Sequence, residues 1–362
     1  VLPDCFVVPV ASLFSDLVPH CTIFVCYNKR IFLHPEDIFM LTIYQLMKYL
    51  RNHHSITVRS NQAQSLRNLG YYHGFKGYRF IRNPNHRIPF STLDEIIALN
   101  KFDLQLKTIL YPKVMFIENA LKSYVIESVL KDSGSENLDI IFNRSVTDYR
   151  SYTPGSDSYH KQYAKRMILK GKINNALLRD YTNKKQSVNH FFDADQSIPI
   201  WAVFESLTLG EFGTFFSCAN SNVKLHTSRI LHLPGNLDAD GKLTEYIIYT
   251  IKDLRNAVAH NNTIFDTRFQ TGKVNRRLIT LLESEVGLAN LDFKYIDAYI
   301  ILITYVLRKM GETKTSCKQF IISFTDCTDT LRMQMSSNIC NQILGTQQRS
   351  HLKQLQNFIS NS

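Results

Sequence analysis

Cysteine is sparse and unpaired in this sequence. The seven cysteines are scattered, their number is odd, and no two of them form a Cys-x-x-Cys pair. A disulfide framework and a structural zinc site both need more regular spacing, so neither is expected. We expect reduced thiols, as in a cytoplasmic protein, and we expect neither a metal ion nor another cofactor.

Long apolar runs are also missing. No stretch reaches the roughly 18 apolar residues that a membrane-spanning helix needs. Residues 1–26 are fairly apolar, but they contain Asp4 and Asp16 and lack a basic start, which does not fit a signal peptide. We therefore expect a cytoplasmic protein that has no membrane partner.

The chain is short of acidic residues. It has 42 Lys and Arg against 31 Asp and Glu, which gives a net charge of +11 and a pI of about 9.2. A charge this far from zero favours a polyanionic partner, either nucleic acid or an acidic membrane surface. Plain solubility is the alternative, because many basic globular proteins bind no nucleic acid.

Strand-like alternation is almost absent, and residues 55–60 are the one candidate strand. Apolar residues recur instead at helical spacing, and Thr92 and Glu95 form a capping box before the strongest segment. We therefore predict an all-α bundle. The expected helices cover residues 35–53, 91–131, 156–185, 199–219, 242–262, 275–286 and 294–309, with a last helix within 345–362.

Single residues interrupt or anchor these expected helices. Pro112 is expected to divide or kink the helix over residues 91–131, because proline removes a backbone donor. Gly210 and Gly213 allow close packing or a break in the segment that contains them. Trp201 is expected in the core, and a cap is expected near Thr244.

The motifs of many enzymes are missing: no Gly-x-Gly-x-x-Gly, Walker loop, His-Glu-x-x-His or Gly-x-Ser-x-Gly occurs. The sequence does contain DLRNAVAHNNTIFD, Asp253–Asp266, after a long amphipathic helix. Metal-free RNA cleavage needs proton transfers at the 2′-hydroxyl and the leaving oxygen, and a cation at the phosphate. His260 suits the proton transfers because the unperturbed pKa of histidine is about 6.5, and the planar fork of Arg255 suits the phosphate.

The spacing of this Arg–His pair is weak evidence alone, because Arg67–His73 and Arg79–His86 are spaced similarly. Five residues place two side chains about 140° apart on an ideal helix, so the pair shares no face. Both side chains reach one phosphate only if the helix frays or if two copies combine in a symmetric dimer. Alternatively, the pair lies at a helix C-terminus, interacts with the helix dipole, and is followed by a cap at Asn261 or Asn262.

The segment resembles the Arg-Asn-x-x-x-His motif of HEPN ribonucleases, and more closely the Abi-like bacterial abortive-infection proteins of the AbiD and AbiF group. Three further blocks occur in the order typical of that group. They are a tyrosine-rich turn, Leu69–Phe80, with Gly77 and Tyr78; a helical block, Thr92–Ser123, with Phe102, Asp103, Leu106 and Glu118; and Pro199–Phe216, with Trp201, Glu205 and Gly210. Four ordered blocks are more specific than one spacing.

The resemblance implies an antiphage abortive-infection protein that acts on RNA as a metal-independent HEPN endoribonuclease. Arg255 and His260 become the catalytic pair, Asn256 their polar partner, and dimerisation completes the site. Glu118 would support the pair by orienting either member, or would instead pair with Lys122 along its own helix. The role in phage defence and a small noncoding RNA as partner follow from the family, not from any residue.

For the fold, the resemblance implies a HEPN-like helical bundle with additional N- and C-terminal helices. We expect an N-terminal helical region over residues 1–90, the HEPN-like core over 91–312 and a C-terminal helical extension over 313–362. Two positions depart from the family pattern. Gly74 stands where an arginine is frequent, and Lys107 replaces an arginine, which keeps the charge and loses the fork.

Two basic segments are candidate RNA-binding surfaces. Aromatic and basic residues interleave in Tyr71–Arg87, and Tyr159–Lys185 has many basic residues and a single acidic one. Aromatic rings stack on unpaired bases while cations hold phosphates, although core packing and a solvated charged face would give the same patterns. The candidate residues are Lys76, Arg79, Arg82, Arg87, Lys161, Lys165, Arg166, Lys170 and Lys172.

Two classes of function therefore stay open. One is a ribonuclease, whether it acts alone or as a toxin-like component held by an antitoxin. The other is a non-catalytic RNA-binding scaffold whose Arg–His motif is structural and whose noncoding-RNA complex acts through a partner.

Overall fold

The computed structural model describes residues 41–361, and residues from Ile43 onward form one compact unit. Every regular element in these residues is a helix, and only isolated bridges such as Thr57 with Thr92 occur in place of a sheet. The prediction of an all-α fold is confirmed. Residues 35–40, where the first helix was expected to begin, lie outside the described residues.

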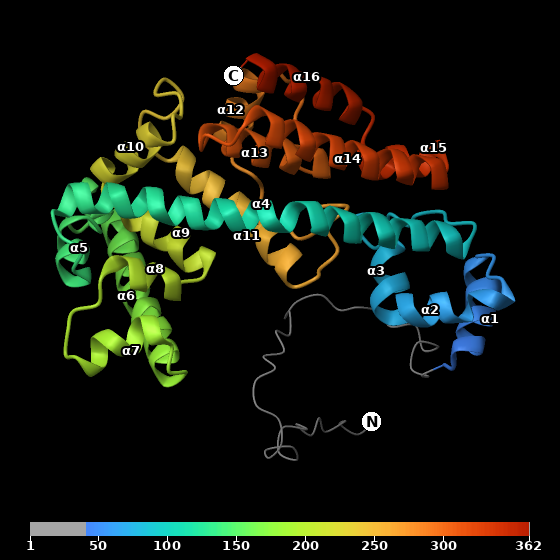
Figure 1. Ribbon diagram of the computed structural model, residues 1–362, viewed down its shortest axis with the longest axis horizontal. Helices are drawn as coiled ribbons and strands as arrows, with labels where there is room; N and C mark the ends of the chain where they lie inside the picture. Colours follow the sequence, from blue (N-terminus) through green and yellow to red (C-terminus); the bar gives the residue numbers. More distant parts are fainter. Residues whose placement is uncertain (1–40, 362) are drawn as a thin grey trace, which may run out of the picture. The chain divides into compact units, whose positions relative to one another are not determined.

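Most of the helices are joined by short connections, and longer ones precede α4 and α11 and follow α11 (Figure 1). Their bounds are α1 Ile43–His54, η2 Ser60–Gln62, α2 Ala63–Leu69, η3 Tyr71–Phe75, α3 Lys76–Tyr78, α4 Leu93–Ser133, α5 Leu138–Arg144, η4 Asp148–Ser151, α6 Asp157–Thr182, α7 Gln186–Asp193, α8 Ile200–Ser206, α9 Leu209–Cys218, α10 Ser221–Ile230, α11 Leu243–Ala259, α12 Arg276–Val286, α13 Ile296–Lys309, α14 Lys314–Gln334, α15 Ser337–Leu344 and α16 Gln348–Asn361.

Helix α4 is the central helix of the compact unit, because helices from the N-terminal, middle and C-terminal parts of the unit all contact it. The Thr92 hydroxyl accepts from the Glu95 N–H, and the Glu95 carboxylate accepts from the Thr92 N–H, so the expected capping box forms. The helix runs for 41 residues and is followed by Gly134 in the left-handed conformation. Pro112 lies inside it, so the expected division at this proline is wrong, while the alternative, a kink, stays a prediction. Figure 1 shows α1–α3 near the N-terminal end of α4 and α5–α7 near its C-terminal end.

Helices α10, α11 and α14 pack on α4, so the expected C-terminal extension contacts the expected core. Helix α16 packs on α13 and α14, and His351 Nδ1 lies 2.8 Å from the Asp297 carboxylate of α13. This hydrogen bond raises the pKa of His351, since the carboxylate favours the charged imidazole. The divisions at residues 90 and 312 stay a prediction.

The segment over residues 199–219 is not one helix. It breaks between α8 and α9, where Thr208 and Glu211 form a capping box that starts α9, and Gly210 lies in the first turn after this break. Gly213 instead allows close packing: a Cβ there would lie 3.1 Å from side-chain atoms of Ile248 and Tyr249 in α11.

Two further expectations are corrected. Trp201 is 40% exposed at the start of the short helix α8, and its ring packs edge-on against Phe191, so it is not a core residue. The N-cap of α11 is Lys242 rather than Thr244, which is buried in the first turn. The Asp238 carboxylate accepts from the Leu243 N–H and satisfies that helix start.

The cysteines of the described part are Cys218, Cys317, Cys327 and Cys340, and all four are free and buried. Burial raises their pKa values, that of Cys218 to about 11. None of the helices over residues 41–361 combines the length and the apolar character needed to cross a membrane.

Candidate functional site at the end of α11

Arg255 is held by Glu118 of α4. The Arg255 Nε donates to the Glu118 carboxylate at 2.7 Å, and Nη1 donates to Asn256 Oδ1 at 3.3 Å. The Glu118 side chain is only 5% exposed and also lies 3.2 Å from Lys122 Nζ. Both expected contacts of Glu118 therefore form together. The Arg255 side chain remains 23% exposed, and no described residue accepts a hydrogen bond from its Nη2.

His260 lies directly after α11 and is exposed. Its N–H donates to the Asn256 carbonyl, while Asn261 takes the left-handed conformation with φ 55°. The Asn262 N–H then donates to the Ala257 carbonyl at 2.8 Å, which closes a Schellman-type cap. The cap expected at Asn261 is present, and it fixes the backbone on which His260 stands.

Two side chains of α4 fix the loop after His260. Lys107 Nζ donates to Asn261 Oδ1 at 2.8 Å and pairs with Asp103 at 2.7 Å. The buried Asp103 carboxylate accepts from the backbone N–H groups of Ile264 and Phe265, at 2.8 and 2.9 Å. Tyr78 also donates to Asp103 at 3.1 Å. Asp103 of the helical block therefore holds this loop, and the same carboxylate contacts Tyr78 of the tyrosine-rich turn.

A second carboxylate anchors the end of this loop. Asp266 is buried and pairs with Arg268, whose guanidinium donates to the carbonyls of Gly77 and Phe80 at 2.7 Å each. The Asp266 carboxylate also accepts from the Arg82 N–H at 2.6 Å. The loop is thus tied to the tyrosine-rich turn as well as to α4.

The two departures from the family pattern have different effects. Lys107 makes the contacts that position Asn261, so its single ammonium suffices here. Gly74 lies so close to the Leu69 carbonyl that a Cβ would overlap it. This turn therefore has no room for the arginine that the family pattern places here.

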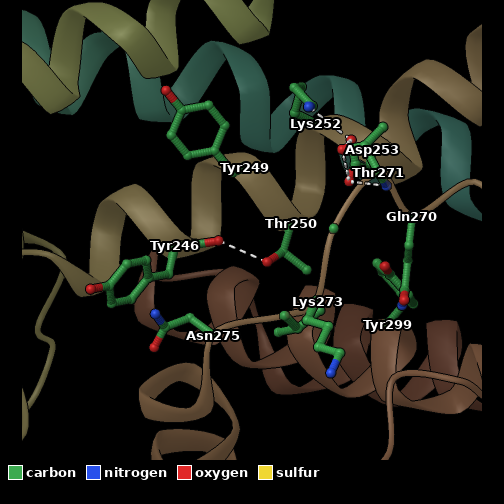
Figure 2. A pocket seen from close by; sticks show the side chains of 12 residues that line it. Tyr246, Tyr249, Thr250, Lys252, Asp253, Gln270, Thr271, Lys273, Asn275 and Tyr299 are labelled. Atoms are coloured by element: carbon green, nitrogen blue, oxygen red, sulfur yellow. Dashed lines mark hydrogen bonds and ion pairs between the residues drawn. The ribbon is translucent and has the colours of Figure 1, made fainter.

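A cavity of about 300 Å³ lies on another face of α11, and neither Arg255 nor His260 lines it. Figure 2 shows its wall, in which Asp253 joins α11 to the following loop by accepting from the Thr271 hydroxyl and N–H. Lys252 pairs with the same carboxylate at 2.8 Å. This contact is a further tether of the chain that follows the Arg–His pair.

The candidate RNA-binding residues divide into engaged and exposed side chains. Arg166 donates to the Val146 and Phe142 carbonyls, at 2.9 Å each, near the C-terminal end of α5. Lys165 contacts Ser217, and the Arg82 guanidinium donates to the Lys294 carbonyl. The exposed ones are Arg87, Lys161, Lys170 and Lys172, while Lys76 and Arg79 are half-buried. The two segments lie near opposite ends of α4 (Figure 1) and do not form one surface.

From the sequence, Asp266 was given no role, and Asp103 was named only as part of the family resemblance. Both carboxylates are buried, and both accept hydrogen bonds from backbone N–H groups of distant segments. For Asp103 the signal was available, because an aspartate on the apolar face of a helix needs a partner. Which partner it takes depends on contacts more than 150 residues apart, which no local pattern encodes.

These observations define an all-α protein in which an Arg–His pair at a helix end is positioned by a carboxylate from a long neighbouring helix. Residues 64–266 match the family model of the Abi-like proteins, so the chain belongs to the Abi-like family. The match ends at the anchoring residue Asp266 and includes all four blocks. No curated protein and no solved structure matches the chain. Membership links the protein to abortive infection, a form of phage defence.

Proposed function

We propose that this protein is a HEPN-type endoribonuclease of phage defence, which cleaves RNA without a metal ion through Arg255 and His260. The observation that carries the proposal is the geometry at the end of α11. A carboxylate orients an arginine that keeps free donors, and an exposed histidine stands on a fixed backbone five residues later.

Each group has a defined task in this reaction. The His260 imidazole accepts the proton of the 2′-hydroxyl, whose oxygen attacks phosphorus. Arg255 donates to the phosphate oxygens on which negative charge accumulates. The bond to the 5′ oxygen breaks, that oxygen takes up a proton, and a 2′,3′-cyclic phosphate remains.

A symmetric dimer supplies what one chain lacks. The leaving oxygen needs an acid while the 2′-hydroxyl needs a base, and His260 of one chain serves one role at a time. A twofold axis beside the end of α11 would bring in His260 of the partner subunit as the second proton-transfer group. The expected signs are a dimer by light scattering and specific activity that rises with protein concentration; a fully active monomer would remove the composite site.

The cleavage test uses purified protein and RNA in EDTA, with analysis of the product ends. Cyclic phosphate ends should appear with the unaltered protein and vanish with Arg255→Ala and His260→Ala. His86→Ala is the matched control, because this exposed histidine belongs to the similarly spaced Arg79–His86 pair. Equal loss in the control would point to a general effect on folding or binding.

The scaffold remains a second candidate because the contacts of Arg255 are also those of a structural residue. Its Nε and Nη1 are both occupied, and its carboxylate partner is buried. Tight binding of RNA that stays uncut would favour this function. A single RNA of defined length copurifying with the protein would identify the noncoding partner.

A further inference from the structure

The surface of α4 between its two anchors to α11 carries an unpaired aromatic side chain. Lys107 contacts Asn261 at one anchor, and Glu118 contacts Arg255 at the other. The chain directions at these contacts show that α4 and α11 run antiparallel. Tyr111 lies between the anchors on α4.

Helix geometry places Tyr111 on the face that carries both anchors. It follows Lys107 by four residues, a rotation of about 40°, and precedes Glu118 by seven, a rotation of about 20°. The corresponding rises along the axis are about 6 and 10 Å. The ring therefore borders the end of α11 rather than the opposite side of α4.

The Tyr111 side chain is available to a ligand. It is 49% exposed, and no described residue forms a hydrogen bond, an ion pair or a ring contact with it. The register of the two anchors places the end of α11, near Ala259, across from it. Ala259 is exposed and small, so it leaves the ring uncovered, and the exposed His260 follows it. The exposed Leu104, seven residues before Tyr111, extends the same face.

We propose that Tyr111 is a stacking platform for an unpaired base of the RNA whose neighbouring phosphate lies at Arg255 and His260. The inference rests on the proposed function and adds its substrate class, single-stranded RNA. An aromatic face accepts any base, because every base has a π-face, so the platform would position the strand without selecting a sequence.

The charges around the ring favour a polyanion over a second copy of the chain. Asp103 and Glu118 are buried and already paired, and the cations Lys107, Lys122 and Arg255 outnumber them. A second copy packed directly on the ring would set these cations against their own copies, so the twofold axis of the proposed dimer would lie beside the ring and leave its face open. RNA instead supplies a phosphate for Arg255, which keeps an unpaired donor, and a base for the ring.

The test measures binding of single-stranded RNA containing 2-aminopurine, in the His260→Ala background so that the RNA stays intact. Tyr111→Leu keeps apolar bulk and removes the ring, and Tyr111→Phe keeps the ring. We expect Tyr111→Leu to weaken affinity at least about fivefold and to abolish the quenching of 2-aminopurine, while Tyr111→Phe stays within about twofold. Phe116→Leu is the matched control, because Phe116 is 46% exposed on the same helix but about 140° away around it.

The possible failures are distinct. RNA binding that is equal in Tyr111→Leu and Tyr111→Phe overturns the platform and leaves the proposed function standing. A change of dimer mass in Tyr111→Leu, with RNA affinity unchanged, would assign the face to contact between copies and also overturns it. Absence of RNA binding in every variant, including the one with Tyr111 intact, defeats the proposed function itself, and the platform with it.

Discussion

At the scale of single residues, the orientation of Arg255 depends on one carboxylate. Glu118 is buried, pairs with Arg255 and Lys122, and has no other charged partner among the described residues. The sequence placed it correctly on α4 but left two contacts as alternatives. The structure contains both, because α11 packs against the face of α4 that also carries Lys122.

We predict that Glu118→Gln lowers the free energy of unfolding by about 1–3 kcal/mol, since two cations lose a charged acceptor in a largely buried place. The shape of the side chain is kept, so the fold should persist, and the loosened Arg255 should slow RNA cleavage. Urea denaturation and single-turnover cleavage measure the two effects. Glu127→Gln, at an exposed position of the same helix, should change neither. Equal stability of the two variants would contradict the role of Glu118.

At the scale of elements, the sequence patterns that span about one helical turn could be predicted, and contacts between distant segments could not. The capping box at Thr92 located the start of α4. The same pattern at Thr208 and Glu211 was present and would have located the break before α9. The exposure of Trp201 could not be read in this way, because it depends on how α7 and α8 are packed rather than on the hydrophobicity of the side chain.

Helix α9 provides a test of packing through its glycine. We predict that Gly213→Ala lowers the free energy of unfolding, because the new Cβ would crowd Ile248 and Tyr249 of α11. Gly171→Ala in α6 is the matched change, since nothing lies within 4 Å of its added Cβ. It should stabilise by about 0.5–1 kcal/mol through helix propensity alone. Chemical denaturation should separate the two variants by at least about 1 kcal/mol; equal effects would show that α9 and α11 can move apart at no cost.

At the scale of the whole molecule, the charge of +11 indicates a polyanionic partner but not where it binds. The structure sorts the basic residues by what they already contact. Arg166 supports the carbonyls near the end of α5, so its charge serves the fold. Lys161 and Lys172 of α6 are exposed and have no hydrogen-bonding or ion-pair partner among the described residues. Net charge alone could not make this distinction.

If RNA follows α6, the logarithm of its binding constant should fall linearly with the logarithm of salt concentration, by about 0.7 for each phosphate neutralised on a single strand. Lys161→Gln and Lys172→Gln should each make this slope shallower by about that amount, because each removes one phosphate contact. Lys318→Gln, at an exposed position of α14, should leave the slope unchanged. Arg166→Gln should instead lower the free energy of unfolding, since two carbonyls lose their donor. Fluorescence anisotropy across a salt series measures the slopes. Identical slopes for the α6 and α14 variants would show that the charge on α6 is a solvated surface and that RNA binds elsewhere on the protein.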